Sequence, residues 1–248
     1  MPGKCEVYIL NIRSVSPGDY QTLLSYMTPQ TLERIQRFKF PEDKLRCALG
    51  EYFVKQTFAR RYGLPYAEVE KRAGEKGKPY LKTDLAFQFN ISHSGDYLVC
   101  AITDIPVGTD VQTMVPLEKG CAEKILSARE LSEWETLKPR EAAAYLIKQW
   151  TYKESYAKLK GLGLFLPFPA ITVVPGGIVH AGGAFEACFF AEERLGDYYL
   201  VTSTSSPREI EYRRVGGLEE VRQKLPDPHE AVFLTASQLG IGSGISQV

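Results

Sequence analysis

The sequence predicts an α+β protein in which helix-rich sections alternate with groups of short strands. Apolar residues recur at helical spacing over positions 29–62 and 140–160, whereas extended apolar segments occupy positions 87–112 and 171–204. Glycine-containing turn signals separate the later extended segments. With 248 residues, of which 44% are hydrophobic, the chain can bury a full core as one large domain or two small ones.

The first half is expected to begin with a strand and to continue with helices. Val7–Ile12 is apolar and alternates enough for a strand, and Ser16 is placed to cap the helix that follows. A second helical segment starts at Pro29, and a third covers Asp43–Tyr62. Gly63 is expected to end this third helix.

A connection rich in glycine and lysine, Lys71–Lys82, separates these helices from three predicted strands. Its basic residues fit a solvated loop, which the segment alone favours, but they also fit a basic border over an anionic ligand. The strands are predicted at Phe87–Ser92, Tyr97–Thr103 and Pro106–Gln112. The short turns between them lead us to expect one small antiparallel sheet.

The second half is expected to begin near Val115 with further helices. Ser127 and Glu130 form a capping box for a helix that runs to Leu137, and a long helix covers Arg140–Lys160. The elements expected after it are strands at Ile171–Val174, Phe185–Phe190 and Tyr198–Thr204, a short helix at Leu218–Leu225 and a loosely held tail from Pro226. We therefore divide the chain into an N-terminal half (1–106), a C-terminal half (107–225) and a tail (226–248).

Composition and charge exclude several classes of protein. The 30 basic and 30 acidic side chains cancel, so no overall field attracts nucleic acid or an anionic membrane. Because the sequence has no signal peptide and no run of about 18 apolar residues, we expect a cytoplasmic protein. The five cysteines are odd in number and contain no CxxC pair, which indicates reduced thiols that mostly fill the core.

The long helix carries a charged pair that could belong to a site. Glu154 and Lys158 are four residues apart and therefore share a helix face, and we expect Lys153 beside them. An exposed pair of this kind is also common on helix surfaces, where it contributes about 0.3–0.5 kcal/mol. This stretch alone favours the surface pair, so the functional interpretation depends on partners from other segments.

The predicted strands supply such partners. His93 lies between Ser92 and Ser94 at a strand end, where donors can converge on a phosphate, although a lone histidine in a turn usually has no such role. Asp110 and Gln112 face the same side of their strand, which holds two oxygen-bearing side chains next to each other. Paired oxygen ligands suit a hard cation such as Mg²⁺.

Four segments together resemble the 4′-phosphopantetheinyl transferases. FNISHSGDYLVCAI, VGTDVQ and WTYKESYAKLKGLGL resemble the three signatures of that family, in this order and at these separations. The upstream segment ERIQRFKFPEDKLRCALGE resembles the longer, surfactin-type branch, so the resemblance spans about residues 33–164. It implies two similar α+β halves that pack as a pseudo-dimer within one chain, with the active site between them.

The resemblance also implies an activity and a metal. The family transfers the 4′-phosphopantetheine arm of coenzyme A to a serine of an acyl, peptidyl or aryl carrier protein and releases 3′,5′-ADP. By this similarity Asp110 and Glu154 would hold Mg²⁺, and Glu154 would also be the candidate base for the carrier serine. Lys158 would neutralise pyrophosphate oxygens.

Other residues are carried over as contacts to coenzyme A. His93 and Ser92 would contact phosphates, and Lys78 and Pro79 would line the adenine side. Arg46, and less directly Arg34, fall where basic residues of the family hold the 3′-phosphate.

One departure from the family pattern concerns the metal. Gln112 stands where the family usually has the second acid of its DxE pair, so the metal ligands carry one formal negative charge fewer. Its amide oxygen, or a water, can still take that position because Mg²⁺ needs few protein carboxylates. The departure leaves both the affinity for metal and the choice between Mg²⁺ and Mn²⁺ open.

Two other functions remain as alternatives. A non-catalytic module that binds coenzyme A or a carrier protein is favoured by Gln112 and opposed by the presence of both Glu154 and Lys158. A different nucleotide-dependent enzyme is disfavoured because the sequence has neither a GxxxxGK[ST] loop nor a GxGxxG motif. We expect coenzyme A and a carrier protein as partners, no nucleic acid or membrane, and a monomer.

Overall fold

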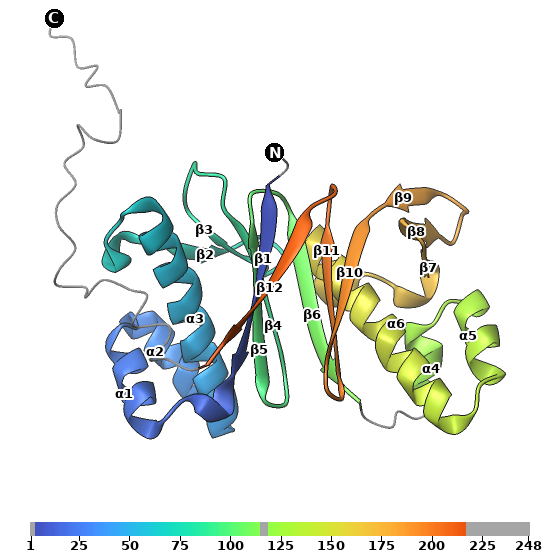
Figure 1. Ribbon diagram of the computed structural model, residues 1–248, viewed down its shortest axis with the longest axis horizontal. Coiled ribbons are helices and arrows are strands. Elements are labelled where there is room, and N and C mark those ends of the chain that lie inside the picture. Colours follow the sequence, from blue (N-terminus) through green and yellow to red (C-terminus); the bar gives the residue numbers. More distant parts are fainter. Residues whose placement is uncertain (1–2, 115–118, 217–248) are drawn as a thin grey trace, which may run out of the picture.

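The computed structural model describes residues 3–114 and 119–216, in which helices flank two central sheets (Figure 1). Helices α1–α3 lie on one side of the sheets and α4–α6 on the other. The helices are α1 (Pro17–Ser25), α2 (Pro29–Gln36), α3 (Pro41–Tyr62), α4 (Lys119–Ile125), α5 (Ala128–Glu135) and α6 (Pro139–Lys160). Two halves, each made of helices and sheet, confirm the predicted α+β class.

The ends of the helices follow the local signals in the sequence. Ser16 and Ser127 both form capping boxes, at the first turns of α1 and α5. The two long helices, α3 and α6, have 22 residues each and begin with proline. Each ends at a glycine in the left-handed conformation, Gly63 with φ 65° and Gly161 with φ 68°, which other residues rarely adopt. This similarity of α3 and α6 agrees with two similar halves.

In the part of the chain that the structure describes, the strands form two main sheets and two small ones. The order is β12-β1-β5-β4 in the first sheet and β10-β11-β6 in the second, and β2-β3 and β7-β8-β9 are the small sheets. The strands before α4 are β1 (Lys4–Asn11), β2 (Lys71–Ala73), β3 (Pro79–Leu81), β4 (Gln88–Ser94), β5 (Tyr97–Thr103) and β6 (Val107–Thr113). The later strands are β7 (Ile171–Val174), β8 (Gly177–His180), β9 (Phe185–Ala187), β10 (Phe189–Leu195), β11 (Tyr198–Thr204) and β12 (Glu209–Val215).

The prediction of one sheet made of three successive strands is wrong for the third strand, β6. β4 and β5 pair as an antiparallel hairpin, but β6 pairs with β11 from the far end of the chain. The chain therefore crosses from the first sheet to the second immediately before β6. This crossing places the edge of β6 that does not pair with β11, its outer edge, next to β4. It determines the geometry of the site described below.

Four parts of the strand pattern differ from the sequence-based expectation. The connection Lys71–Lys82 contains the hairpin β2–β3 rather than only a loop. β8 was not predicted, and the expected strand Phe185–Phe190 is divided between β9 and β10. β12 was also missed because its sequence, EIEYRRV, is mostly charged. It pairs in parallel with β1, so a segment from the C-terminal half completes the sheet of the N-terminal half.

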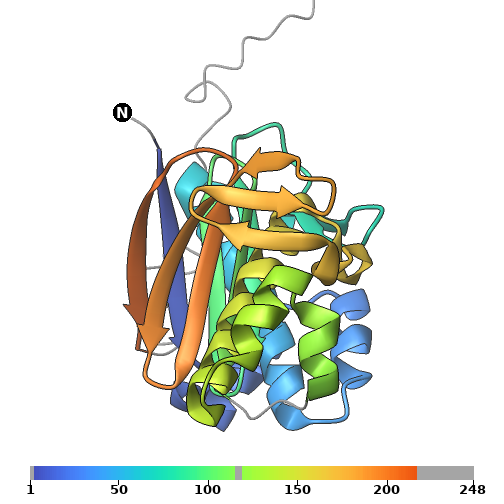
Figure 2. The same ribbon diagram turned by 90° about the vertical axis from the view of Figure 1, so that its right-hand side faces the viewer.

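The core has separate clusters on the two faces of the first sheet. Leu98, Cys100 and Ile102 of β5 pack with the apolar face of α3, whereas Val99 and Ala101 pack toward the second sheet. Burial on both faces explains the continuous apolar sequence of this strand. In the C-terminal half, the small sheet β7–β9 lies beside α6 on the outer side (Figure 2).

Several predictions concern the ends of the chain, its cysteines and membranes. The expected helix Leu218–Leu225 and the tail 226–248 lie outside the described residues. The boundary predicted at residues 106–107 falls at the start of β6. All five cysteines are free thiols, and Cys5, Cys100 and Cys188 are buried. Among the described residues, no helix is long and apolar enough to span a bilayer.

Candidate active site

Strand β6 carries the two oxygen-bearing side chains predicted to lie next to each other. Val111 between them is fully buried and packs between the two main sheets. Asp110 is only 1% exposed, and Gln112 Nε2 donates a hydrogen bond to Asp110 Oδ2 at 3.0 Å. The alternation of the strand therefore has the predicted effect, because residues 110 and 112 meet on one face.

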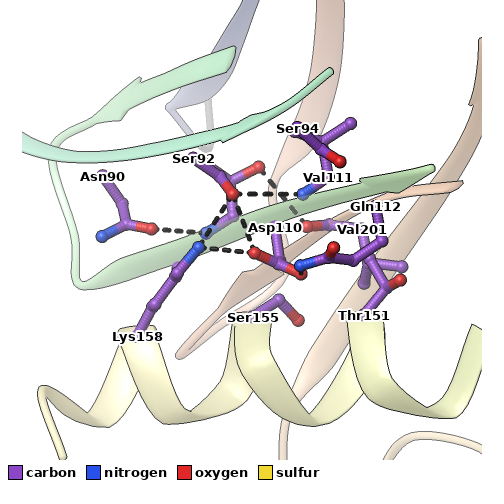
Figure 3. A network of polar contacts seen from close by, with 12 residues as sticks. Asn90, Ser92, Ser94, Asp110, Val111, Gln112, Thr151, Ser155, Lys158 and Val201 are labelled. Atoms are coloured by element: carbon purple, nitrogen blue, oxygen red, sulfur yellow. Dashed lines mark hydrogen bonds and ion pairs between the residues drawn. The ribbon is translucent and has the colours of Figure 1, made fainter. Parts of the chain in front are cut away.

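Helix α6 packs closely on β6 because Gly108 has no side chain. A Cβ atom at Gly108 would lie 1.9 Å from the carbonyl oxygen of Ser155, so a larger residue would push the helix away. The close packing brings Lys158 Nζ to 2.5 Å from Asp110 Oδ1 (Figure 3). Ser92 of β4 joins this pair, since its Oγ lies 2.8 Å from Lys158 Nζ and 2.8 Å from Asp110 Oδ1. One network thus connects β4, β6 and α6.

Glu154 lies one helical turn before Lys158 and is half-buried. Burial raises the pKa of its carboxyl group, the negative charge of Asp110 raises it further, and Lys158 partly offsets both effects. The two carboxylates and one ammonium therefore carry a net charge of −1 when all are ionised. A positive ion between the carboxylates would relieve the repulsion that raises this pKa.

The oxygen atoms of this site fit a hard divalent cation that is held by few protein ligands. Asp110 and Glu154 offer carboxylate oxygens, and rotation of the Gln112 amide by half a turn would present its carbonyl oxygen instead of Nε2. No group of three or more His, Cys, Asp or Glu side chains suited to a metal occurs in the described part of the chain.

Arg46 and His93 form a basic neighbourhood beside the network. Arg46, on α3, donates from Nη1 to Asp43 Oδ1 at 2.7 Å and from Nη2 to the carbonyl of Gly95. Its Nε is buried and has no hydrogen-bond partner in the structure. Partial desolvation and the positive charges of Arg46 and Lys158 lower the pKa of His93. These groups leave unsatisfied donor capacity for an anion.

Lys78 approaches the site from the hairpin of the N-terminal half. Its Nζ donates to the carbonyl oxygens of Val107 at 3.0 Å and Leu159 at 3.3 Å. Burial lowers the pKa of Lys78 to about 8. Pro79 follows as the first residue of β3. Lys78 therefore contacts both β6 and α6 near the ends of those elements.

Two basic residues from the sequence analysis lie elsewhere. Arg34 Nη2 pairs with Glu51 Oε2 at 3.0 Å, and Lys71 pairs with the same carboxylate oxygen. No contact among the described residues connects Arg34 with Arg46 or His93. The expectation that Lys153 lies beside Glu154 and Lys158 is wrong, because Lys153 is fully buried on another face of α6.

The burial of Lys153 has a structural explanation. Its Nζ pairs with Glu130 Oε2 at 2.5 Å. It also donates to three carbonyl oxygens, those of Ile125 (2.8 Å), Phe168 (3.0 Å) and Ile171 (2.8 Å). This ammonium group fastens α6 to α5 and to the start of β7, and it takes no direct part in the site.

The sequence analysis missed two residues that contact β6. Asn90 Oδ1 accepts a hydrogen bond from the amide of Thr109 at 2.8 Å, and Ser94 Oγ accepts one from the amide of Thr113 at 3.1 Å. A signal was available, since polar residues at 90, 92 and 94 alternate along the strand and share one of its faces. Alternation alone does not show that their partner is the backbone of a strand in another sheet.

Comparison with known proteins assigns the family. A profile described as "4′-phosphopantetheinyl transferase, N-terminal" matches residues 14–104, and one described as "4′-phosphopantetheinyl transferase superfamily" matches residues 106–203. A "4′-phosphopantetheinyl transferase" of Bacillus subtilis is 32% identical over 161 residues, which are 65% of this chain and 72% of that relative. The chain belongs to the 4′-phosphopantetheinyl transferases.

Further relatives agree with this family and with its surfactin-type branch. "4′-Phosphopantetheinyl transferase Sfp" of Bacillus subtilis strain 168 is 31% identical over 161 residues, 65% of this chain and 72% of that relative. A human "L-aminoadipate-semialdehyde dehydrogenase-phosphopantetheinyl transferase" is 29% identical over 178 residues, 66% of this chain and 53% of that protein. In this phosphopantetheinyl transferase the two matched profiles meet at residue 105, in the turn between β5 and β6.

Proposed function

We propose that this phosphopantetheinyl transferase moves the 4′-phosphopantetheine arm of coenzyme A to a serine of a carrier protein at the junction of β4, β6 and α6, with Mg²⁺ as its metal. Transfer of that arm from coenzyme A to carrier proteins is the activity of the family. The observation that carries the assignment of the site is the meeting of Asp110 on β6 with Lys158 and Glu154 on α6, a segment far from β6 in the sequence. An exposed surface pair on α6 would not explain why Asp110 is almost fully buried beneath Lys158.

The metal would be held by Asp110 and Glu154, with Gln112 as a third oxygen ligand or as a support for a water ligand. When bound, Mg²⁺ supplies positive charge that stabilises the pyrophosphate oxygens in the transition state. The few protein carboxylates are compatible with Mg²⁺, which usually retains several waters, and Mn²⁺ would fit the same donors.

Glu154 would accept the proton of the carrier serine, directly or through a water. Its raised pKa suits this task, because a carboxylate with a higher pKa is a better proton acceptor while it remains ionised at neutral pH. The serine oxygen forms a bond to the phosphorus that bears pantetheine. The bond from that phosphorus to the bridging oxygen breaks, and the leaving 3′,5′-ADP takes the electron pair.

The basic residues would hold the anionic donor substrate. Lys158 and Ser92 face the same network as Asp110, so they would contact the pyrophosphate, together with His93. Arg46 would bind the 3′-phosphate, supported by its unpartnered Nε. Lys78 and Pro79 would line the adenine side. Arg34 could join only if it left Glu51, which makes it the weakest member of this set.

Both halves of one chain contribute to this site, which supports a monomer as the active unit. Ser92 and His93 come from the first half, and Asp110 and Glu154 from the second. A cytoplasmic location is supported by the free cysteines. The alternative of a non-catalytic binding module rests on Gln112 alone.

Mass spectrometry of the carrier protein tests the proposal. The protein is incubated with an apo carrier, coenzyme A and Mg²⁺, and we expect the carrier to gain the mass of phosphopantetheine. Glu154→Gln should lose about a hundredfold or more of the rate, the scale expected for a general base, while part of the coenzyme A binding survives. Absence of the adduct with acyl, peptidyl and aryl carriers alike would favour a non-catalytic binding module. Fast turnover by Glu154→Gln would refute the roles proposed for Glu154 as metal ligand and general base.

A further inference from the structure

β6, the strand that carries Asp110, has one edge that no backbone ladder covers among residues 3–114 and 119–216. Its other edge pairs with β11 over the full length of the strand, whereas β4 belongs to a different sheet. Side chains of the N-terminal half bond this outer edge instead. The contacts are Lys78 Nζ to the Val107 carbonyl (3.0 Å), Asn90 Oδ1 to the Thr109 amide (2.8 Å), Ser92 Oγ to the Val111 amide (3.3 Å) and Ser94 Oγ to the Thr113 amide (3.1 Å).

The spacing of these contacts fixes the register between the two halves. Residues 90, 92 and 94 share one face of β4, and the amides of 109, 111 and 113 share one side of β6. Each β4 side chain meets the amide 19 residues further along the chain, so the two strands match at three successive positions. A slip of one residue would turn the amides away from their acceptors, and it would also turn Asp110 to the opposite face.

Asp110 lies between Thr109 and Val111, whose backbone amides donate to Asn90 and Ser92. Its carboxylate meets Lys158 and Ser92 only if the backbone on both sides stays where Asn90 and Ser92 hold it. Asn90 is 4% exposed and Thr109 is fully buried. Removal of the Asn90 side chain would leave a buried amide without an acceptor, and β6 could recover a partner for it only by moving.

We infer that Asn90 and Ser94 are positioning residues for the metal-binding carboxylate of Asp110, acting through the backbone of β6. Among the described residues, no hydrogen bond or ion pair joins either side chain to Asp110, Glu154 or Lys158, so the effect is indirect. Ser92 combines this role with direct contact to the network. The arrangement makes the metal site dependent on the docking of one half of the chain against the other.

The inference rests on the proposed function, since it assumes that Asp110 and Glu154 bind a divalent cation. The experiment is the binding of Mn²⁺ alone, followed by the electron paramagnetic resonance signal of the free ion, without coenzyme A or carrier. Asn90→Ala and Ser94→Ala should each raise the Mn²⁺ dissociation constant about tenfold, the lower end of the range for residues that orient metal ligands. Ser94→Thr keeps the hydroxyl group and should bind Mn²⁺ like the parent protein.

Thr103→Val is the matched control. Thr103 ends β5 and is 2% exposed, and its hydroxyl contacts the Lys4 carbonyl of β1 and Asp104 Oδ1, both at 3.1 Å, rather than the backbone of β6. This variant should lower the unfolding midpoint and leave Mn²⁺ affinity unchanged. If Asn90→Ala fails to fold, Ser94→Ala carries the test, because Ser94 is only partly buried at the end of β4.

The outcomes separate the inference from the function on which it rests. Parent-like Mn²⁺ affinity in a folded Asn90→Ala and in Ser94→Ala would overturn the inference and leave the metal site intact. The inference would also be overturned if Thr103→Val weakened Mn²⁺ binding as much as Asn90→Ala and Ser94→Ala, since the effect would then be general destabilisation. Failure of the parent protein to bind Mn²⁺ would refute the metal site itself and the inference with it.

Discussion

The buried pair of Lys153 and Glu130 allows a stability prediction whose size follows from the structure. The Lys153 side chain is 0% exposed and the Glu130 side chain 3%, and Nζ and Oε2 are 2.5 Å apart. Lys153→Met preserves most of the side-chain volume but removes the ammonium group. Glu130 would keep two backbone donors, the amides of Ser127 at 2.8 Å and Val173 at 3.0 Å, but would lose its only charged partner among the described residues.

Breaking a buried ion pair by removing one partner typically costs about 3–5 kcal/mol. The three carbonyl oxygens that lose the Lys153 donor add to the penalty, although such terms are not additive. We therefore expect Lys153→Met to lower the free energy of unfolding by about 3–5 kcal/mol at neutral pH. Most domains have a total stability of only about 5–15 kcal/mol, so the variant should be close to its folding limit.

Denaturation by urea, followed by tryptophan fluorescence, measures this loss. The two tryptophans, Trp134 and Trp150, lie on α5 and α6, the helices that the pair connects. Lys148→Met is the matched control, because Lys148 is 40% exposed and pairs with Glu192 at 2.7 Å on the surface. Its loss should be at most about 1 kcal/mol. A loss of unfolding free energy by Lys153→Met no larger than that of Lys148→Met would refute the reasoning.

Two further predictions concern the metal site. Gln112→Glu should lower the Mg²⁺ concentration needed for half-maximal rate. Gln112→Ala should reduce activity less than Asp110→Ala, because Asp110→Ala removes the charged ligand of β6. Equal loss of activity in the two alanine variants would instead make Gln112 an essential ligand. The raised pKa of Glu154 before metal binds predicts that Mg²⁺ binding, and with it activity at subsaturating Mg²⁺, falls in acid at a higher pH than for an ordinary glutamate, because protonated Glu154 cannot bind metal. Lys158→Met removes the charge that lowers this pKa, so the acid limb of the pH–rate profile should move to still higher pH, and a shift to lower pH would contradict the argument.

The sequence by itself determined the local elements and the residue types of the site. Ser16, Ser127, Gly63 and Gly161 mark helix ends through interactions within one or two turns, so spacing along the chain is enough to locate them. The same holds for Asp110 and Gln112, which share a face because a strand alternates. The family signatures likewise depend on order and separation in the chain, and the comparisons with known proteins confirm the family that they imply.

Only the tertiary structure decided which segments meet. β6 pairs with β11, and β12 joins β1, because strand partners are selected by packing between segments about 90 to 200 residues apart, which no local pattern encodes. The direction of Lys153 and the pairing of Arg34 with Glu51 depend in the same way on what lies opposite them in space. Asn90 and Ser94 read in sequence as ordinary polar residues of a strand. Their contacts with β6 exist only because the chain crosses from one sheet to the other immediately before β6. This crossing leaves backbone amides of β6, on both sides of Asp110, that need hydrogen-bond acceptors from the N-terminal half.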